Sequence, residues 1–211
     1  MKVAVICGLK AEADCWKRSP LRPEIYISSS RPFVTRQIVQ AALAHGAEVL
    51  ISFGIAGGLH PTLKTGQLLW PHTIKAAHGE WRCDMDCAAK LFTIPACATH
   101  EPIYGSDKMV TSVEEKKKLL TATGCAAVDM ESHIVAEAAS AAHIPFFAMR
   151  AVCDVAHDPL PAIAQLPLND NGQPSLRDVV RLILSRPATV VEAVNMGMNF
   201  SAALRKLRGI F

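Results

Sequence analysis

The first eight residues of the chain, MKVAVICG (residues 1–8), decide the fold class. Residues 3–6 form a continuous apolar run in which Val3, Val5 and Ile6 are β-branched. A strand with one face in water would alternate apolar and polar residues, whereas an uninterrupted apolar run is typical of a strand buried on both faces of a parallel sheet. The sequence therefore predicts an α/β protein in which this segment is a central parallel strand.

Strand and helix patterns alternate along the rest of the chain. A helix is indicated where apolar residues recur at helical spacing and end at Gly46, and another where Ser112 begins the capping-box pattern SVEE. The further strands expected are residues 25–27, 49–53 and 146–152. The helices expected are residues 33–45, 112–123, 130–142, 176–184 and 189–205. Residues 67–104 are hairpin-like in sequence, but no pattern assigns a particular element there, and residues 161–174 are predicted to form a loop that acts as a lid.

The composition indicates one soluble domain over residues 1–211. Half of these residues are hydrophobic and 19% are charged, which is enough apolar material for one core. No stretch approaches the roughly 20 uninterrupted apolar residues of a membrane span. The net charge of +3 is small, and the basic residues are scattered apart from the run Lys116, Lys117 and Lys118. We interpret this run as a solvated helix face, so nucleic-acid binding is not expected.

The seven cysteines indicate a reducing compartment. They are odd in number and lie mostly in apolar segments, and the chain starts without the regions of a secretory signal, so a cytoplasmic location is expected. Cys83 and Cys87 have the spacing of a metal-binding pair, but a zinc site needs a second pair or closely spaced histidines. Neither a metal nor another cofactor is predicted.

Three acids stand where a carboxylate is costly to bury. Glu12 follows the first strand, Glu131 lies on the apolar stripe of helix 130–142, and Asp154 ends the strand that begins at residue 146. Ligands of open α/β sheets bind at the carboxyl ends of the strands, so the three acids are candidates for one site. Burial raises carboxyl pKa values toward the range that acid–base catalysis near neutral pH requires.

Each acid also has a purely structural interpretation. Glu12 is equally explained as a solvated acid at a helix start, and Glu131 as a helix-terminal acid paired with a lysine. Asp154 falls on the same strand face as Arg150 and is also explained as its ion-pair partner. Residues 54–58, GIAGG, indicate a ligand-facing loop, but they lack the GxGxxG pattern of a dinucleotide site.

Five segments together resemble a known family. They are MKVAVICGLKAEAD (1–14), SFGIAGGLHPTLKTG (52–66), GSDKMVTS (105–112), VDMESHIVAEAA (128–139) and MRAVCDVA (149–156). Their order and approximate spacing are similar to those of the methylthioadenosine/S-adenosylhomocysteine nucleosidase branch of the nucleoside phosphorylase superfamily, over most of residues 1–157. VDMES and RAVCD are the most specific. The chain from residue 159 onward resembles the hopanoid-associated phosphorylases, which are similar to adenosylhopane nucleosidases.

The resemblance implies a nucleoside phosphorylase-like fold, a three-layer α/β/α arrangement with a central mixed β-sheet, in a homo-oligomer. The implied activity is that of a purine-nucleoside N-glycosidase that releases adenine from a 5′-substituted adenosine. Adenosylhopane, in hopanoid biosynthesis, is the candidate substrate. The expected partner is this small-molecule nucleoside, with peripheral contact to a lipid-like substrate and no membrane span.

The resemblance also implies a role for each candidate residue. Glu12 corresponds to the acid that activates the attacking water, and Glu131, with Met130 before it, to the pair that holds the ribose hydroxyls. Asp154 corresponds to the acid that protonates the leaving purine at N7, and Arg150 supports that site. These roles are coherent, because cleavage of an N-glycosidic bond develops positive charge on the sugar and negative charge on the base.

Further positions are assigned with departures from the family pattern. Met109 corresponds to the position that packs against the base, although composition alone explains Met109 and Met130 as core residues. Gly54 and Ile55 correspond to the nucleophile side, where the family has serine in place of Ile55. A serine is also replaced by Cys153, and the turn at residues 28–32 reads SSSRP instead of containing glycine.

Two other enzyme classes and one binding role compete with the hydrolase. They are a phosphate-dependent phosphorylase, a dehydrogenase, and a non-catalytic nucleoside-binding protein on the same fold. Glu12 favours hydrolysis, because an acid beside the nucleophile helps water and repels phosphate. The apolar surface of residues 187–204 is explained either as ordinary core or as a lining for a large apolar 5′ group.

Overall fold

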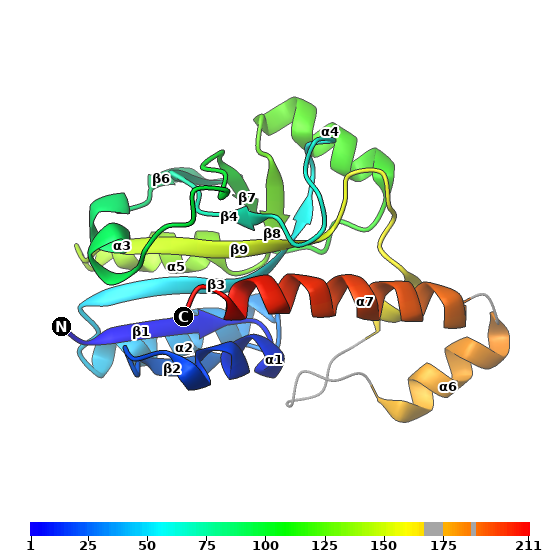
Figure 1. The fold of residues 1–211 in the computed structure, drawn as a ribbon, viewed down its shortest axis with the longest axis horizontal. Coiled ribbons are helices and arrows are strands. Elements are labelled where there is room, and N and C mark those ends of the chain that lie inside the picture. Colours follow the sequence, from blue (N-terminus) through cyan, green and yellow to red (C-terminus); the bar gives the residue numbers. More distant parts are fainter. Residues whose placement is uncertain (167–174, 187–188) are drawn as a thin grey trace.

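The computed structural model describes residues 1–166, 175–186 and 189–211, which contain a nine-stranded mixed sheet (Figure 1). Its strands are β1 (Val3–Cys7), β2 (Glu24–Ile27), β3 (Val49–Gly58), β4 (Leu68–Leu69), β5 (Thr73–Ala76), β6 (Gly79–Arg82), β7 (Ile103–Gly105), β8 (Ala127–Asp129) and β9 (Phe146–Asp154). Strand β1 is parallel to β2 and β3, and β9 is parallel to β3. Strand β8 is antiparallel to the end of β3 and continues the sheet to β7, β5 and β6.

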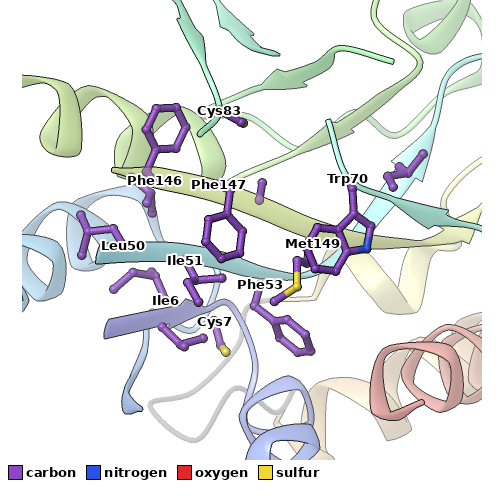
Figure 2. Close-up of a cluster of buried hydrophobic side chains, with 14 of the residues drawn as sticks. Ile6, Cys7, Leu50, Ile51, Phe53, Trp70, Cys83, Phe146, Phe147 and Met149 are labelled. Carbon is purple, nitrogen blue, oxygen red and sulfur yellow. The ribbon is translucent and has the colours of Figure 1, made fainter. Parts of the chain in front are cut away.

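Strands β1, β3 and β9 form the buried centre of the sheet. Val5, Ile51 and Phe147 are in register across these strands, and none of the three has exposed surface. Figure 2 shows Ile51 and Phe147 in a cluster that also contains Trp70 and Met149. Burial of a side chain of this size contributes about 1.5–3 kcal/mol. This explains why uninterrupted apolar runs predict the central strands correctly.

Helices cover both faces of the sheet. In Figure 1, α2 (Pro32–Ala44) and α5 (Ser132–Ala141) lie behind the sheet and α7 (Thr189–Arg208) lies in front, which gives the expected three layers. The other helices are α1 (Lys10–Ala13), η1 (Asp14–Arg18), α3 (Met85–Leu91), α4 (Val113–Thr123), η2 (Ala162–Gln165) and α6 (Leu176–Ser185). The five predicted helices are confirmed to within a few residues.

Local signals set the helix ends. Gly46, just after α2, has φ of +84°, and Gly124, the C-cap of α4, has φ of +66°, conformations that glycine adopts without strain. At the start of α4, the Ser112 hydroxyl accepts a hydrogen bond from the Glu115 amide at 3.1 Å. The Glu115 carboxylate accepts one from the Ser112 amide at 3.0 Å. The predicted capping box is therefore confirmed.

Residues 67–104, which are hairpin-like in sequence, form short elements that extend the sheet. Strands β5 and β6 make an antiparallel hairpin, and β7 pairs in parallel with β5 and β8. Helix α3 begins at Asp84, whose side chain accepts a hydrogen bond from the Cys87 amide at 2.8 Å. Strands this short carry too few residues for a periodicity to be recognised.

Two expectations about elements are wrong. Residues 54–58 are not a loop but the second half of β3, because their backbones pair with β9 and, at the end, with β8. The first half of α7 is not ordinary core: Val190, Val191, Val194 and Met198 are between 45% and 65% exposed. The packing of α7 comes instead from its second half, where Ala203, Leu204 and Leu207 are buried.

Other expectations concern thiols, membrane spans and the lid. All seven cysteines are free thiols, and six of them are buried. None of the helices in residues 1–166, 175–186 and 189–211 is long and apolar enough to cross a membrane. The predicted lid begins with the short helix η2, while its residues 167–174 lie outside the described residues.

Candidate active site

Glu12 is held at the carboxyl end of β1 by backbone groups. It lies in α1 and is only 3% exposed. One carboxylate oxygen accepts a hydrogen bond from the Leu9 amide and the other from the Ile55 amide, each at 2.8 Å. Gly54 permits this approach, because a Cβ atom there would lie within 3.0 Å of the Glu12 carboxylate. Burial raises the pKa of Glu12, against the opposing effects of Arg150 and these backbone hydrogen bonds.

Arg150 is the cation of this region and is 1% exposed in the middle of the sheet. Its Nε donates to Asp129 at 2.5 Å, its Nη2 donates to the Ser52 hydroxyl at 2.6 Å, and Nη2 lies 3.8 Å from Glu131. The other oxygen of Asp129 accepts from the amide and hydroxyl of Ser132 at 3.2 and 2.6 Å. Arg150 Nη1 is buried, and neither of its two N–H groups has a hydrogen-bond partner among the described residues.

Glu131 is the N-cap residue of α5, not a residue on its apolar stripe, so the predicted helical position is wrong. It is nevertheless buried, since α5 begins against the sheet. Burial, assisted by the charges of Asp129 and Glu12 and opposed by Arg150, raises the pKa of Glu131 to about 8. Gly8 leaves space for this carboxylate, because a Cβ atom at Gly8 would lie 2.8 Å from its Oε1. We call Glu12, Asp129, Glu131 and Arg150 the buried cluster.

Asp154 lies at the end of β9 and faces Lys116 of α4. The two form an ion pair at 2.5 Å in which the Asp154 side chain is 18% exposed and the Lys116 side chain 1% exposed. We call them the edge pair. Burial raises the pKa of Asp154, and the Lys116 ammonium opposes this rise. Gly57 is the β3 partner of Asp154, and a Cβ atom there would lie 3.2 Å from the carboxylate.

The buried cluster and the edge pair lie at the same end of the sheet. Strands β1, β3 and β9 are parallel, and Glu12, Gly54 and Asp154 all belong to their carboxyl ends. Gly54 contacts Glu12 and Gly57 contacts Asp154, and three residues of an extended strand span about 10 Å. Two carboxylates thus flank a stretch of strand that carries few side chains. This is where ligands of α/β sheets bind.

The structure brings most of the predicted site residues together. Glu12, Glu131, Arg150, Gly54 and Ile55 are linked by the contacts above, and Met130 donates its backbone amide to the Glu131 carboxylate. Asp154 lies near these residues because its carboxylate approaches Gly57, which is three residues beyond Gly54 on β3. Met109 is 39% exposed, and none of the contacts between these acids in the described part of the chain involves it.

The structural interpretations of the acids are only partly right. Glu12 lies at a helix start but is buried rather than solvated, and Glu131 stands at the N-terminus of a helix, as expected, but has Arg150 and not a lysine beside it. Asp154 pairs with Lys116, while Arg150 pairs with Asp129. The interpretation of residues 116–118 as a solvated face holds for Lys117 and Lys118 and fails for Lys116.

Asp129, Ser52 and Lys116 are site residues that were not predicted. Asp129 ends a buried strand of only three residues, which no periodicity reveals. Ser52 is a polar residue inside the apolar strand β3, and a polar residue in such a strand can be recognised from the sequence as a candidate site residue. Lys116 stands at helical spacing from Val113 and Leu120, so its place on the apolar face of α4 was readable.

No metal site is present in the part of the chain that the structure describes: no group of three or more His, Cys, Asp or Glu side chains there is placed to hold an ion. Cys83 and Cys87 are both buried, and burial raises the pKa of each thiol. Thiols whose ionisation is disfavoured are poor metal ligands.

Solved structures of other proteins match this architecture. S-adenosylhomocysteine nucleosidase of Streptococcus pyogenes, in complex with 5-methylthiotubericidin, superposes with a TM-score of 0.65 and 19% identity over 74% of this chain and 85% of that chain. The 5′-methylthioadenosine/S-adenosylhomocysteine nucleosidase of Campylobacter jejuni gives a TM-score of 0.64 and 16% identity over 98% and 99% of the two chains. The fold is nucleoside phosphorylase-like.

Further comparisons agree with this nucleoside phosphorylase-like fold. Futalosine hydrolase of Helicobacter pylori matches with a TM-score of 0.61 and 18% identity, over 74% of this chain and 86% of that chain. The sequence model of the phosphorylase superfamily matches residues 97–193, which include β8, α5 and β9. A search of curated proteins finds no significant match.

Proposed function

We propose that this protein is a purine-nucleoside N-glycosidase that uses water to release adenine from a 5′-substituted adenosine. One observation carries the proposal: Glu12 and Asp154 flank a glycine-containing stretch of β3, each held by its own partners. Nucleosidases and a futalosine hydrolase are among the proteins that share the fold, which supports this reaction class.

Asp154 acts at the base. When the bond between the sugar and N9 breaks, its electron pair moves onto the purine, and a proton at N7 neutralises the charge. Asp154 is partly exposed at the open end of β9, and burial raises its pKa toward that of a usable general acid. Met109, on the segment between β7 and α4, packs against the base.

The buried cluster acts at the sugar. Glu131 holds the ribose hydroxyls together with Met130, and Arg150 keeps the Glu131 carboxylate in place from 3.8 Å. Glu12 takes a proton from the water that attacks the face of the sugar opposite the base, the geometry of inverting hydrolysis. The hydrogen bond from the Ile55 amide fixes the Glu12 carboxylate for this step.

Water is a better nucleophile than phosphate at this site. Asp129 neutralises the Arg150 charge, and Glu131, with a pKa of about 8, is largely neutral at pH 7, so an ionised Glu12 leaves the buried cluster with a net negative charge that a phosphate anion would meet. Ile55 adds no polar side chain that would bind an anion.

Product analysis tests hydrolysis against phosphorolysis. The purified protein is incubated with 5′-substituted adenosines, with and without phosphate, and adenine and the sugar product are quantified. We expect adenine and free sugar at a rate independent of phosphate. A ribose 1-phosphate product would make the protein a phosphorylase, and tight binding without cleavage would make it a binding protein.

We further propose that the preferred substrate carries a large apolar 5′ group, with adenosylhopane as the candidate. Helix α7 packs against α1, which carries Glu12, and the Cys15 thiol lies 3.9 Å from the Leu204 carbonyl. In Figure 1 the first half of α7 extends past α1 beyond the end of β1. That half carries the exposed residues Val191, Val194 and Met198, which offer a tail an apolar surface.

Competition between two substrates tests this preference. Each buried methylene adds up to about 0.8 kcal/mol, so we expect a higher kcat/KM for an adenosine with a long alkyl 5′ chain than for methylthioadenosine. Val194→Ser should reduce this preference, whereas Ile25→Ser, on the exposed edge strand β2, should not. An equal or better kcat/KM for methylthioadenosine in the wild type would contradict the substrate class.

A further inference from the structure

Lys116 is a buried lysine whose ammonium group is fully used. Its Nζ donates to Asp154 Oδ2 at 2.5 Å, to the Val155 carbonyl at 2.7 Å and to the Asp158 carbonyl at 2.8 Å. An ammonium group has three protons, and each has an acceptor here. Lys116 thus joins α4 to the Asp154 carboxylate and to the turn that follows it.

Stability alone does not explain this arrangement. Burying a lysine costs several kcal/mol, and a buried ion pair seldom recovers more than that. The neighbouring Lys117 and Lys118 keep their charges in water, so α4 does not require a buried charge. The three hydrogen bonds of the Lys116 ammonium group go to Asp154, Val155 and Asp158, which directs attention to Asp154.

We infer that Lys116 is a positioning residue for Asp154: its three hydrogen bonds fix the carboxyl group and the following turn, and its charge stabilises the carboxylate formed on proton transfer. The inference rests on the proposed function and assigns a further residue to that site. Only one oxygen of Asp154, Oδ2, accepts the Lys116 hydrogen bond, so Oδ1 is left to face the base.

The proton count of the step is balanced. The bond between C1′ and N9 breaks, its electron pair goes to the purine, and the Asp154 proton moves to N7. Water adds to C1′ and gives a proton to Glu12. Lys116 stays protonated throughout and faces a carboxylate that has just become negative. Exchange with solvent then returns a proton to Asp154 and removes one from Glu12.

Among the charged groups around Asp154, Lys116 is the one that lowers its pKa. Burial raises the pKa of Asp154, Lys116 lowers it, and Asp158 in the following turn raises it further. The adjacent Cys153 is buried, with a thiol pKa raised to about 12, so it stays neutral. Strand β3 presents Gly57, which carries no charge. The exposed His157, next to Asp158 in the chain, has its ring Nε2 4.0 Å from the Asp158 carboxylate. Without Lys116, Asp154 would be a weaker acid.

The experiment compares Lys116→Met and Lys116→Arg with Lys117→Met, the exposed neighbour on the same helix. Asp154 is titrated by 13C NMR of its carboxyl group, assigned with Asp154→Asn, and adenine release is measured across pH. In Lys116→Met we expect a higher Asp154 pKa, an alkaline limb of kcat displaced to higher pH, and kcat reduced at least about 10-fold with little change in KM. Lys116→Arg should restore the pKa, and Lys117→Met should match wild type.

A purely structural role would lower the thermal midpoint and leave the Asp154 titration and the pH profile unchanged, and that result would overturn the inference. If Lys116→Met does not fold, Lys116→Gln replaces it, because the amide keeps a hydrogen-bond donor but removes the charge: a higher Asp154 pKa and a displaced alkaline limb support the inference, and an unchanged titration and pH profile contradict it. Wild type that releases no adenine would refute the proposed function, while the titration would still decide whether Lys116 sets the acidity of Asp154.

Discussion

The buried cluster and the edge pair hold their acids in two different ways. In the cluster, three carboxylates share one arginine, and burial together with mutual repulsion raises the pKa of Glu131 to about 8. In the edge pair, one carboxylate has its own lysine and remains partly open to solvent. Burial is the main cause of the raised pKa in both regions; in the cluster, Arg150 opposes the rise at Glu131 while neighbouring carboxylates add to it, whereas in the edge pair the Lys116 ammonium opposes the rise at Asp154. Each arrangement suits a different task, a base beside the sugar and an acid beside the purine.

Asp154→Asn tests the edge pair and should have the largest effect. The amide keeps the shape of the side chain but has no proton acidic enough for N7, so we expect adenine release to fall about 10²–10⁴-fold in a folded protein. Asp14→Asn, in the more exposed pair with Lys17, is the control and should match wild type. Release within about tenfold of wild type would remove Asp154 from the acid role.

Arg150→Met tests the cluster by removing its only cation. Asp129 would then lose its buried ion-pair partner, and breaking a buried pair costs about 3–5 kcal/mol. We expect a loss of that size in urea denaturation at pH 7 and a smaller loss at pH 5, where Glu12 and Glu131, whose pKa values are raised by burial, bind protons more fully. Arg186→Met, in the exposed pair with Glu192, should cost at most about 1 kcal/mol. A loss below about 1 kcal/mol for Arg150→Met would mean that Asp129 and Glu131 do not depend on the guanidinium.

Glu12→Gln tests whether the cluster supplies the base. We expect nucleoside binding, measured by calorimetry, to persist while hydrolysis falls about 10²-fold, because an amide cannot accept the proton of water. The NH2 group of the substituted side chain would also face a backbone N–H at Leu9 or Ile55, so a modest loss of stability is expected. Glu24→Gln, in an exposed pair with Lys2, is the matched control. Unchanged hydrolysis would leave Glu12 a structural role only.

The contrast between the two regions also explains what sequence could predict. Glu12 and Asp154 were recognisable because each follows a long apolar strand, and such strands are the most reliable signal in a sequence. Arg150 was recognisable because it interrupts one. Their partners were harder to find: Asp129 ends a three-residue strand, and Lys116 belongs to a run of lysines whose other members are exposed. Pairings between distant segments depend on topology, which local patterns do not encode.

The elements that were predicted wrongly show the same limit of local sequence patterns. Glycines at residues 54–58 indicate a loop by local propensity, yet β9 and β8 supply the pairing that keeps them in β3. Glu131 was placed on a helical stripe, but α5 starts one residue later, and the acid is buried by where the helix begins. In α7, periodicity predicts an apolar face without specifying which half of it meets the sheet.

Glu131→Gln should have the smallest effect of these substitutions. It tests how the buried cluster controls protonation, because it replaces the acid by an analogue of its neutral form. The pKa of Glu131 in the folded protein, about 8, lies above the ordinary value of 4.5, so the folded state retains a proton that the unfolded chain releases. Ionisation therefore disfavours folding progressively as the pH rises from about 4.5 to about 8. The Gln variant lacks this dependence.

The two proteins should thus have similar urea midpoints near pH 4.5, and the variant should become the more stable one as the pH approaches 8, by an amount on the order of a few kcal/mol. Glu137→Gln, on the exposed side of the same helix, should follow wild type throughout. A constant difference between Glu131→Gln and wild type over this range would show that Glu131 is already ionised in the folded protein. The cluster would then stabilise its acids by pairing, as the edge pair does.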